Sequence, residues 1–330
     1  MTQHSYTTTS HTWTSLVIVM LGLLCAPALT AQSYTKGQHV EPAYEGWRQN
    51  EDGTYNFMFG YMNENWEETP DVAVGPNNFF SPGEADRGQP THFLPRRNRF
   101  TFEVTVPADW GEDEELVWTL NVNGVEKKAY ATLRQDYLVD NMVIASETGS
   151  LGAGTSSPES RANRPPTANV QGDTVRTVRV GQPLSLTTVV TDDGIPEPTD
   201  PVQEARRFAE FTGGAEALAN LTDELILTQR QLRPPIRATV GKVNGLYFSW
   251  NKYRGPGQVK FDKPQVKVWE DTRTSANSPW GALFLAPEVP EDGAYHSTVT
   301  FDTPGTYVLW GRADDGGLYD DAYITVNVRQ

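Results

Sequence analysis

The chain has 330 residues, more than one typical domain, and this length predicts two domains. Its 42 acidic and 27 basic residues give a formal net charge of -15, which keeps a protein soluble and repels phosphate backbones. The charge therefore argues against nucleic acid as a partner.

The N-terminal segment has an apolar run from Leu16 to Cys25, followed by small residues. The run is too short to span a bilayer comfortably and is typical of a secretory signal peptide, although no Lys or Arg precedes it. We expect residues 1–31 to be a signal peptide, and the remaining chain to be secreted or periplasmic with no membrane span. A retained N-terminal anchor is the alternative. Lipid attachment is not expected, because Leu24 precedes the cysteine.

Residues 32–148 are expected to form an N-terminal β-sandwich domain. Asp52-Gly53 and Asn123-Gly124 each separate two strand-like runs, and such pairs supply the positive φ that a hairpin turn requires. Between these turns the run "TYNFMFGYMN" alternates, so one face of the predicted strand is wholly aromatic. We interpret this face as core rather than as a ligand platform. Its members are Tyr55, Phe57, Phe59 and Tyr61.

A long loop, residues 67–98, interrupts the strands of this domain. It is rich in Pro, Gly and Asn and shows no helical or strand periodicity. Loops of this length are uncommon in compact domains and are often functional, so we expect an ordered loop packed across the sandwich. Its charged residues either form a ligand-binding site or, as we favour, an internal ion-pair network that holds the loop in place. They are Asp86, Arg87, His92, Arg96 and Arg97.

The second half of the chain follows a tract, residues 149–167, whose Gly, Ser and Pro content is typical of a flexible interdomain linker. Residues 168–330 are expected to form a second β-sandwich. Within it, residues 200–235 predict a short helical insertion, because Asp200 can cap a helix and Gly213-Gly214 can break one. The predicted fold class is all-β, with two immunoglobulin-like sandwiches.

Three stretches of the second half carry a family resemblance. They are "VGQPLSLTTVVTDDGIPEP", "LYFSWNKYRGPGQVKF" and "VTFDTPGTYVLWGRADDGGLYDDAYITVNV". Together they resemble the immunoglobulin-like sandwich domains of the polycystic-kidney-disease (PKD-like) type found in bacterial exported proteins. The resemblance covers about half of residues 168–330, and the N-terminal domain does not share it. It implies an immunoglobulin-like sandwich, in which Tyr307 stands at the position of a tyrosine corner.

The Asp-Asp-Gly turns of this half have two interpretations. In the first, which we favour, each turn ends a strand, the glycine is left-handed and the aspartates bond to the local backbone. In the second, the carboxylates converge at one end of the sandwich and bind Ca²⁺, which takes about six to eight oxygen ligands. The candidate metal ligands are Asp192, Asp193, Asp314, Asp315, Asp320 and Asp321. No other cofactor is expected.

Stronger catalytic signals are missing from the sequence. After signal cleavage no cysteine is left, there is no phosphate-binding loop or nucleophile elbow, and His39, His92 and His296 lack metal-site spacing. We therefore predict a non-enzyme, a binding, adhesion or accessory module for a polysaccharide or an envelope protein. The alternatives are an enzyme or ligand site in the 86–97 loop and a structural subunit of an exported assembly. Exposed aromatic side chains would favour sugar binding, and a buried carboxylate beside His92 would favour an enzyme. A large apolar patch would favour a subunit of an assembly.

Overall fold

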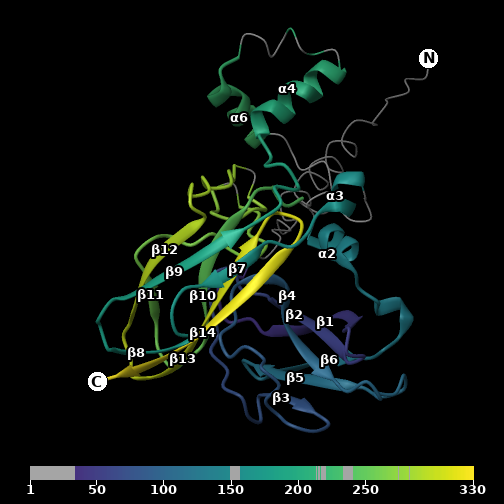
Figure 1. The fold of residues 1–330 in the computed structure, drawn as a ribbon, viewed down its shortest axis with the longest axis vertical. Coiled ribbons are helices and arrows are strands. Elements are labelled where there is room, and N and C mark those ends of the chain that lie inside the picture. The colour runs from purple at the N-terminus through teal and green to yellow at the C-terminus, as the bar shows by residue number, and fades with distance from the viewer. Residues whose placement is uncertain are drawn as a thin grey trace, which may run out of the picture. The chain divides into compact units, whose positions relative to one another are not determined.

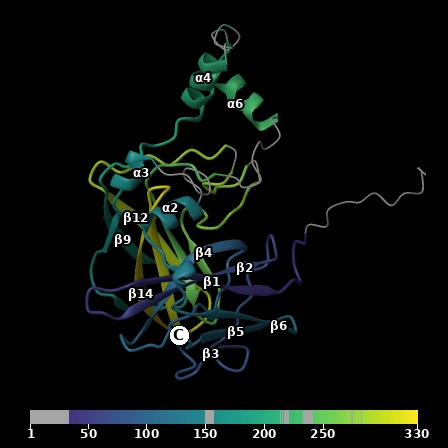
Figure 2. The same cartoon turned by 90° about the vertical axis from the view of Figure 1, so that its right-hand side faces the viewer.

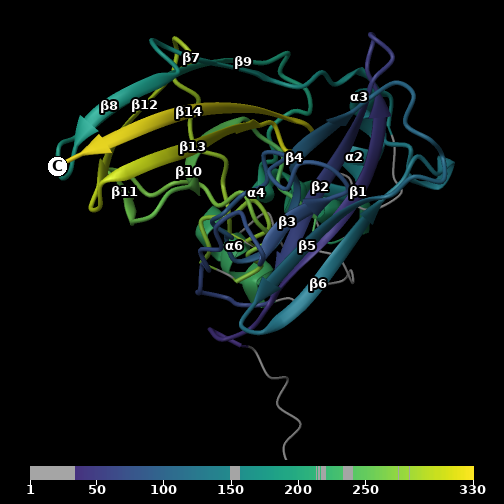
Figure 3. The same ribbon diagram turned by 90° about the horizontal axis from the view of Figure 1, so that it is seen from below.

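A computed structural model describes residues 34–148, 157–212, 214, 216, 221–232, 241–273, 275–281 and 283–330. The predicted signal peptide, residues 1–31, lies outside the described residues. Residues 35–330 fold as one unit that contains two groups of strands, β1–β6 and β7–β14 (Figures 1 and 3). Within the described part of the chain, no helix is long and apolar enough to cross a membrane.

The N-terminal sandwich consists of two three-stranded antiparallel sheets. The first sheet has the order β1-β2-β4, with β1 at Val40–Gln49, β2 at Tyr55–Asn63 and β4 at Arg96–Val106. The second has the order β3-β5-β6, with β3 at Asn78–Ser81, β5 at Leu116–Val122 and β6 at Val125–Ala131. Both predicted hairpins are confirmed. At the β5–β6 turn Asn123 and Gly124 have φ values of 54° and 79°, as a two-residue hairpin loop requires.

The aromatic face of β2 is core, as predicted. Phe57, Phe59 and Tyr61 are buried, and the ring of Phe59 packs on Phe102 of the neighbouring strand β4 and on Trp118 of β5 in the opposite sheet. The opposite face of the same strand is also buried, which the alternation alone did not indicate. Its Met58 is fully buried in a separate apolar cluster, which also contains residues of β4, of helix α2 and of the segment before β14.

The C-terminal sandwich has the strand topology of an immunoglobulin-like domain. Its sheets have the orders β11-β12-β9-β7 and β10-β13-β14-β8, and all neighbours are antiparallel except β14 and β8 (Figures 1 and 2). In chain order these strands correspond to A, A′, B, C, D, E, F and G, with A-B-E-D facing A′-G-F-C. The bounds are β7 Thr167–Val170, β8 Val175–Arg179, β9 Leu184–Thr191, β10 Tyr247–Arg254, β11 Val259–Phe261, β12 Ala294–Phe301, β13 Gly305–Asp314 and β14 Tyr319–Arg329. The predicted all-β class with immunoglobulin-like architecture is confirmed.

The helices are short. Those with bounds in the described part of the chain are η1 at Gln135–Tyr137, α2 at Asn141–Thr148, α3 at Pro158–Ala162, α4 at Pro201–Thr212 and α6 at Asp223–Leu232. α4 and α6 lie in the predicted insertion, and Asp200 caps α4 as expected, because its Oδ1 accepts hydrogen bonds from the backbone N–H of Val202 and Gln203. α3 lies in the tract expected to be a linker and starts with a capping box. The domain boundary at residues 149–167 stays a prediction.

Tyr307 forms the corner that the family resemblance implies. The side chain is fully buried, and its hydroxyl donates a hydrogen bond of 2.8 Å to the backbone carbonyl of Thr303, four residues upstream in the turn before β13. Its ring packs 4.7 Å from that of Phe301. The corner therefore fixes the turn between β12 and β13 and the core beneath it.

Replacing Tyr307 by Phe keeps the ring but leaves the Thr303 carbonyl without its side-chain donor. We expect the free energy of unfolding to fall by about 1–2 kcal/mol. Urea unfolding followed by tryptophan fluorescence measures this change. The matched control is Tyr130→Phe, because Tyr130 is 53% exposed on β6. Equal stability of the two variants would contradict a structural role for the corner.

Candidate functional site

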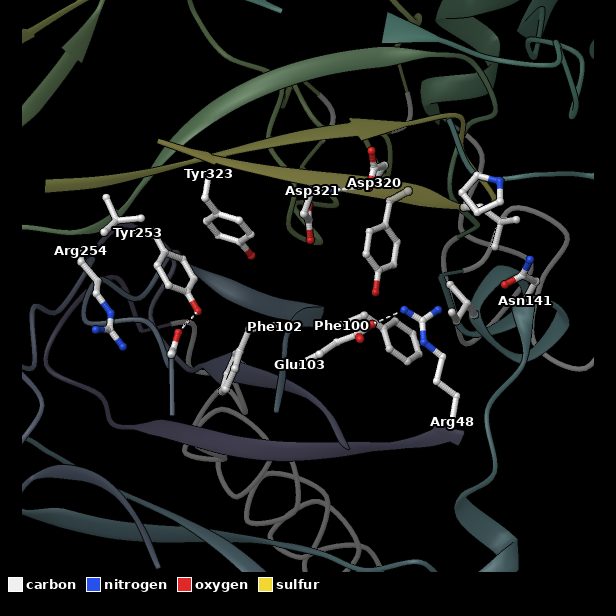
Figure 4. Close-up of a pocket in the computed structure, with 16 residues that line it drawn as sticks. Arg48, Phe100, Phe102, Glu103, Asn141, Tyr253, Arg254, Asp320, Asp321 and Tyr323 are labelled. Carbon is white, nitrogen blue, oxygen red and sulfur yellow. Dashed lines mark hydrogen bonds and ion pairs between the residues drawn. The ribbon is translucent and has the colours of Figure 1, made fainter. Parts of the chain in front are cut away.

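A cleft of about 560 Å³ opens between β4 of the N-terminal sandwich and β14 of the C-terminal one (Figure 4). Aromatic and charged side chains from both sandwiches line it. They include Arg48, Phe100, Phe102, Glu103, Asn141, Tyr253, Arg254, Tyr319, Asp320, Asp321 and Tyr323. A cavity of this size, apolar over much of its wall and with a few converging polar groups, has the character of a ligand site.

The C-terminal wall of the cleft follows from the alternation of β14. Tyr319, Asp321 and Tyr323 share one face, while Ile324 and Val326 belong to the core of the sandwich. The first face would meet solvent in an isolated immunoglobulin-like domain. Here it faces β4, and Tyr323 keeps 39% of its surface exposed. The polar and aromatic residues of β14 therefore form a wall between two sandwiches.

A β-bulge in β4 shapes the opposite wall. Phe59 pairs with Phe102 but Tyr61 pairs with Asn98, so three residues of β4 lie opposite Gly60. Within the bulge Phe100 has φ 48°, a left-handed conformation that is uncommon for a bulky residue. Gly60 is required at this point, since a Cβ there would lie 2.4 Å from the carbonyl oxygen of Asn98. The bulge turns Phe100 to the cleft and takes carbonyls of β4 out of the strand pairing.

Arg312 on β13 uses these carbonyls. Its Nη2 donates a hydrogen bond of 2.6 Å to the carbonyl oxygen of Phe100, and its Nε and Nη2 each lie 2.8 Å from a carboxylate oxygen of Asp321. The guanidinium also lies 3.9 Å from the ring centroid of Tyr319, and Trp310 donates to Asp321. Burial opposes the charge of Arg312, but the carboxylate of Asp321 outweighs it and raises the pKa of the guanidinium above its usual value.

Further ion pairs lie at the two ends of the cleft in Figure 4. At one end Arg48 contacts Glu103 at 2.7 Å, and both side chains are partly exposed. At the other end Arg254 forms two hydrogen bonds with Asp86, of 2.8 and 2.9 Å. These charges are paired but accessible, so they can exchange a partner for a ligand hydroxyl or carboxylate at small cost.

The predicted binding loop, residues 67–98, is held to the rest of the protein by its charged residues. Asp86 pairs with Arg254 on β10, as described above. Arg87 stays local, since its side chain donates to the carbonyl of Glu84 and its backbone N–H to the side chain of Gln89. None of the five predicted loop residues lines the cleft, but Arg254, the partner of Asp86, does.

His92 lies in a separate cluster. Its Nδ1 is 2.8 Å from Oδ1 of Asp71, whose carboxylate also contacts Nζ of Lys252 at 2.9 Å. His92 and Lys252 are buried, whereas the side chain of Asp71 is 41% exposed. The carboxylate beside His92 is therefore not the buried one that would favour an enzyme. The cluster connects the loop to β10.

Arg96 and Arg97 point to two different places. Arg96 donates to the carbonyl of Glu64 and lies over the ring of Trp66, 4.6 Å from its centroid. Arg97 contacts the carboxylate of Glu45 at 2.6 Å. The structure does not bring the five predicted loop residues into one pocket, and their contacts are those of an internal network. A ligand site in this loop stays a prediction.

The first Asp-Asp-Gly turn bonds to its own backbone. Asp192 accepts from the N–H of Gly194 at 2.9 Å and Asp193 accepts from that of Ile195 at 3.0 Å, while Gly194 has φ 80°. Asp320 accepts from the N–H of Ala168 at 2.8 Å. These contacts agree with the structural interpretation of the turn.

The second turn is more deeply buried. Asp315 accepts from the N–H of Gly317 and Leu318 at 2.6 and 2.7 Å, and Asp314 is paired with Lys242. Asp321, the last of the six aspartates, is paired with Arg312. Across the described residues no group of three or more acidic, His or Cys side chains is arranged to hold a metal ion.

Sequence reasoning missed the cleft and two buried cations outside its lining, Arg312 and Lys242. Neither residue belongs to an Asp-Asp-Gly turn or to the predicted binding loop. Arg312 reaches Asp321 through the pairing of β13 with β14, and Lys242 reaches Asp314 from a distant segment. One signal was present in "YDDAY", where Tyr319, Asp321 and Tyr323 alternate on a face that a sandwich core does not use. A face so rich in aromatic and charged side chains indicates a contact surface.

No family model matches the chain, and no curated protein matches it. Among solved structures, it is similar to a chimeric titin Z1Z2, with 10% identity and a TM-score of 0.21 over 89% of this chain and 99% of that one. The D00-D0 domain of intimin has 8% identity and a TM-score of 0.21 over 87% and 98%. An S-layer protein, rSbsC(31-844), has 10% identity and a TM-score of 0.22 over 88% and 28%. At such scores nothing about function follows, and the immunoglobulin-like assignment rests on the strand order.

Asp321→Asn tests the buried pair that joins β13 and β14 to the bulge of β4. The variant keeps the size of the side chain but leaves the guanidinium of Arg312 without a counter-charge. We expect a loss of about 3–5 kcal/mol in the free energy of unfolding, measured by denaturant titration. Glu126→Gln, in an exposed pair with Lys128, is the control and should cost less than about 1 kcal/mol. Similar losses in both variants would show that the buried pair does not hold the interface.

Calcium should leave the stability unchanged, because the six aspartates already bond to backbone N–H groups, Lys242 and Arg312. Thermal melts of the whole chain with calcium and with a chelator measure this. A rise of several degrees with calcium that vanishes in the variant Asp192→Asn/Asp315→Asn would instead establish a calcium site.

Proposed function

We propose that the protein is a non-catalytic binding module that acts after export, secreted or periplasmic, and that it binds a carbohydrate in the cleft between β4 and β14. The export step rests on the signal-peptide pattern of residues 1–31, and the PKD-like resemblance of the second half is consistent with an exported protein. The carbohydrate rests on the cleft itself.

The observation that carries the proposal is the chemistry of the cleft wall. Sugars present apolar C–H faces that pack on aromatic rings, and hydroxyl groups that bond to fixed polar partners. Tyr323 offers a partly exposed ring, whose neighbour Tyr253 packs edge-on at 5.4 Å and donates a hydrogen bond of 2.6 Å to the carbonyl of Gly88. Arg48 and Glu103, both partly exposed, offer donors and acceptors at one end of the cleft. The ring is therefore held in place before any ligand arrives.

An enzyme is the weaker alternative. The hydrogen-bonded group of His92, Asp71 and Lys252 is the arrangement closest to a catalytic one in the predicted loop. Partial burial works against the charge of Asp71, but the hydrogen bonds from His92 and Lys252 hold its pKa below the usual range. The carboxylate is thus an ionised partner of two neighbours. Its contacts anchor the loop rather than activate a nucleophile.

An envelope protein as the ligand is the other alternative. The best-exposed large apolar side chain among the described residues is Phe211 of α4, at 90% exposure. A single exposed side chain is normal on a protein surface and does not make a patch. The cleft therefore supports a small ligand better than the surface supports a protein partner.

Binding of soluble neutral and acidic oligosaccharides, measured by isothermal titration calorimetry, tests the proposal. For a sugar that binds the wild type, Tyr323→Ala should raise the Kd about tenfold, which corresponds to a loss of about 1.4 kcal/mol in binding free energy. Tyr130→Ala, on the exposed face of β6, is the matched control and should bind as the wild type does. The proposal fails if no oligosaccharide binds, or if both variants bind equally well.

A further inference from the structure

A second group of reactive side chains lies away from the sugar cleft, at the end of β13. Lys242 belongs to the segment before β10, and Asp314 is the last residue of β13. The Nζ of Lys242 contacts both carboxylate oxygens of Asp314, with Oδ1 at 2.5 Å. The two side chains are only 2% and 4% exposed. The amine nitrogen thus faces the carboxyl group with no water between them.

Aromatic side chains enclose this pair. The ring of Trp280 lies 5.3 Å from Nζ of Lys242, and Tyr247 stands opposite Asp314 in the pairing of β10 with β13. Tyr247 is fully buried and packs edge-on against Phe284. Such an enclosure excludes water and holds the amine and the carboxyl group in one orientation. The reaction barrier is then lower, because no entropy is lost in bringing the two reactants together.

A second acid stands next to the pair. Asp315 is 1% exposed, and its Oδ1 accepts the N–H groups of the turn, while its Oδ2 has no hydrogen-bond partner among the described residues. Burial, together with the charge of Asp314, raises the pKa of Asp315 to about 7. Near neutral pH this carboxyl group both accepts and donates a proton.

The charges of this group do not balance as ions. One ammonium would face two carboxylates in a site shielded from water, and removing such charges from water costs more than a single pairing returns. With Asp315 protonated, one positive and one negative charge remain, and a proton moved within their contact leaves an uncharged amine and an uncharged acid. This protonation state is also the one from which an amine and a carboxylic acid condense.

We propose that Lys242 and Asp314 are joined by an intramolecular isopeptide bond. The neutral amine of Lys242 attacks Cγ of Asp314, so a C–N bond forms. The C–OH bond of the carboxylic acid then breaks, and the hydroxyl leaves as water with a proton from the amine. Asp315 is the group placed to take that proton and to pass it to the leaving hydroxyl. No oxidant or other co-reactant is needed, and the product is an uncharged amide.

The bond would close the sandwich covalently at one end. It would tie the segment that follows the helical insertion to the last residue of β13, the strand that pairs with β10. The described residues contain no cysteine, so no disulfide can serve this purpose there. An exported protein gains resistance to unfolding and proteolysis from such a cross-link.

Mass spectrometry of the denatured full-length protein tests the bond directly. With the N-terminus determined in the same measurement, we expect a mass one water molecule below that of the sequence, and a proteolytic product in which the Lys242 and Asp314 peptides are linked. The internal control is Lys252 with Asp71, an ion pair whose carboxylate is open to water and whose peptides should be recovered unlinked. A full sequence mass with Lys242 and Asp314 in separate peptides would overturn the proposal.

Two variants separate the chemistry from the packing. Asp314→Asn should still form the bond, but with loss of ammonia instead of water. Asp315→Asn keeps Lys242 and Asp314 in place and removes the proton carrier, so the protein should fold, by circular dichroism, yet keep its full mass. Complete cross-linking in Asp315→Asn would show that Asp315 has no part in the reaction. If this variant does not fold, the mass of the wild type still decides whether the bond exists. Loss of sugar binding is not expected from either variant.

Discussion

The arrangement of the two sandwiches depends on one buried guanidinium. Arg312 projects from the face of β13 that lies outside the immunoglobulin-like core, and it meets both Asp321 on the paired strand and the carbonyl of Phe100 in the other sandwich. An arginine suits this position, because its planar fork bonds a carboxylate on one side and a carbonyl on the other without losing its charge. A lysine could not make both contacts in one geometry.

The bulge in β4 provides the acceptor that Arg312 needs. A regular strand would use the carbonyl of Phe100 in its ladder, but the left-handed conformation of this residue turns it toward the second sandwich. The same backbone conformation orients the side chain of Phe100 so that it packs with Met58 and Leu318. The same local irregularity therefore buries the outer face of β2, holds Arg312 and leaves the cleft beside it. Packing and the candidate site have one common origin.

Features that depend on neighbours in the chain could be predicted from the sequence. The Asn123-Gly124 turn, the Asp200 cap and the Tyr307 corner each depend on a few consecutive residues, and all three are found. The outer face of β2 could not be predicted, because Met58 is buried by segments distant in the sequence, from Phe100 of β4 to Leu318. The cleft was missed for the same reason. Its two walls come from β4 and β14, and no local pattern says that these strands meet.

The Asp-Asp-Gly turns show how one motif acquires two roles. Both turns use aspartate to accept backbone N–H groups and glycine to reverse the chain, as the sequence predicts. The first stays near the surface, where its carboxylates meet only backbone. The second is covered by two segments, one with Lys242 before β10 and one with Trp280 after β11, so its carboxylates are shielded from water and that of Asp314 contacts the amine. Burial, which the motif itself does not encode, brings the carboxylates of the second turn close to an amine and raises the pKa of Asp315. The difference between the turns thus arises from what covers them rather than from their sequences.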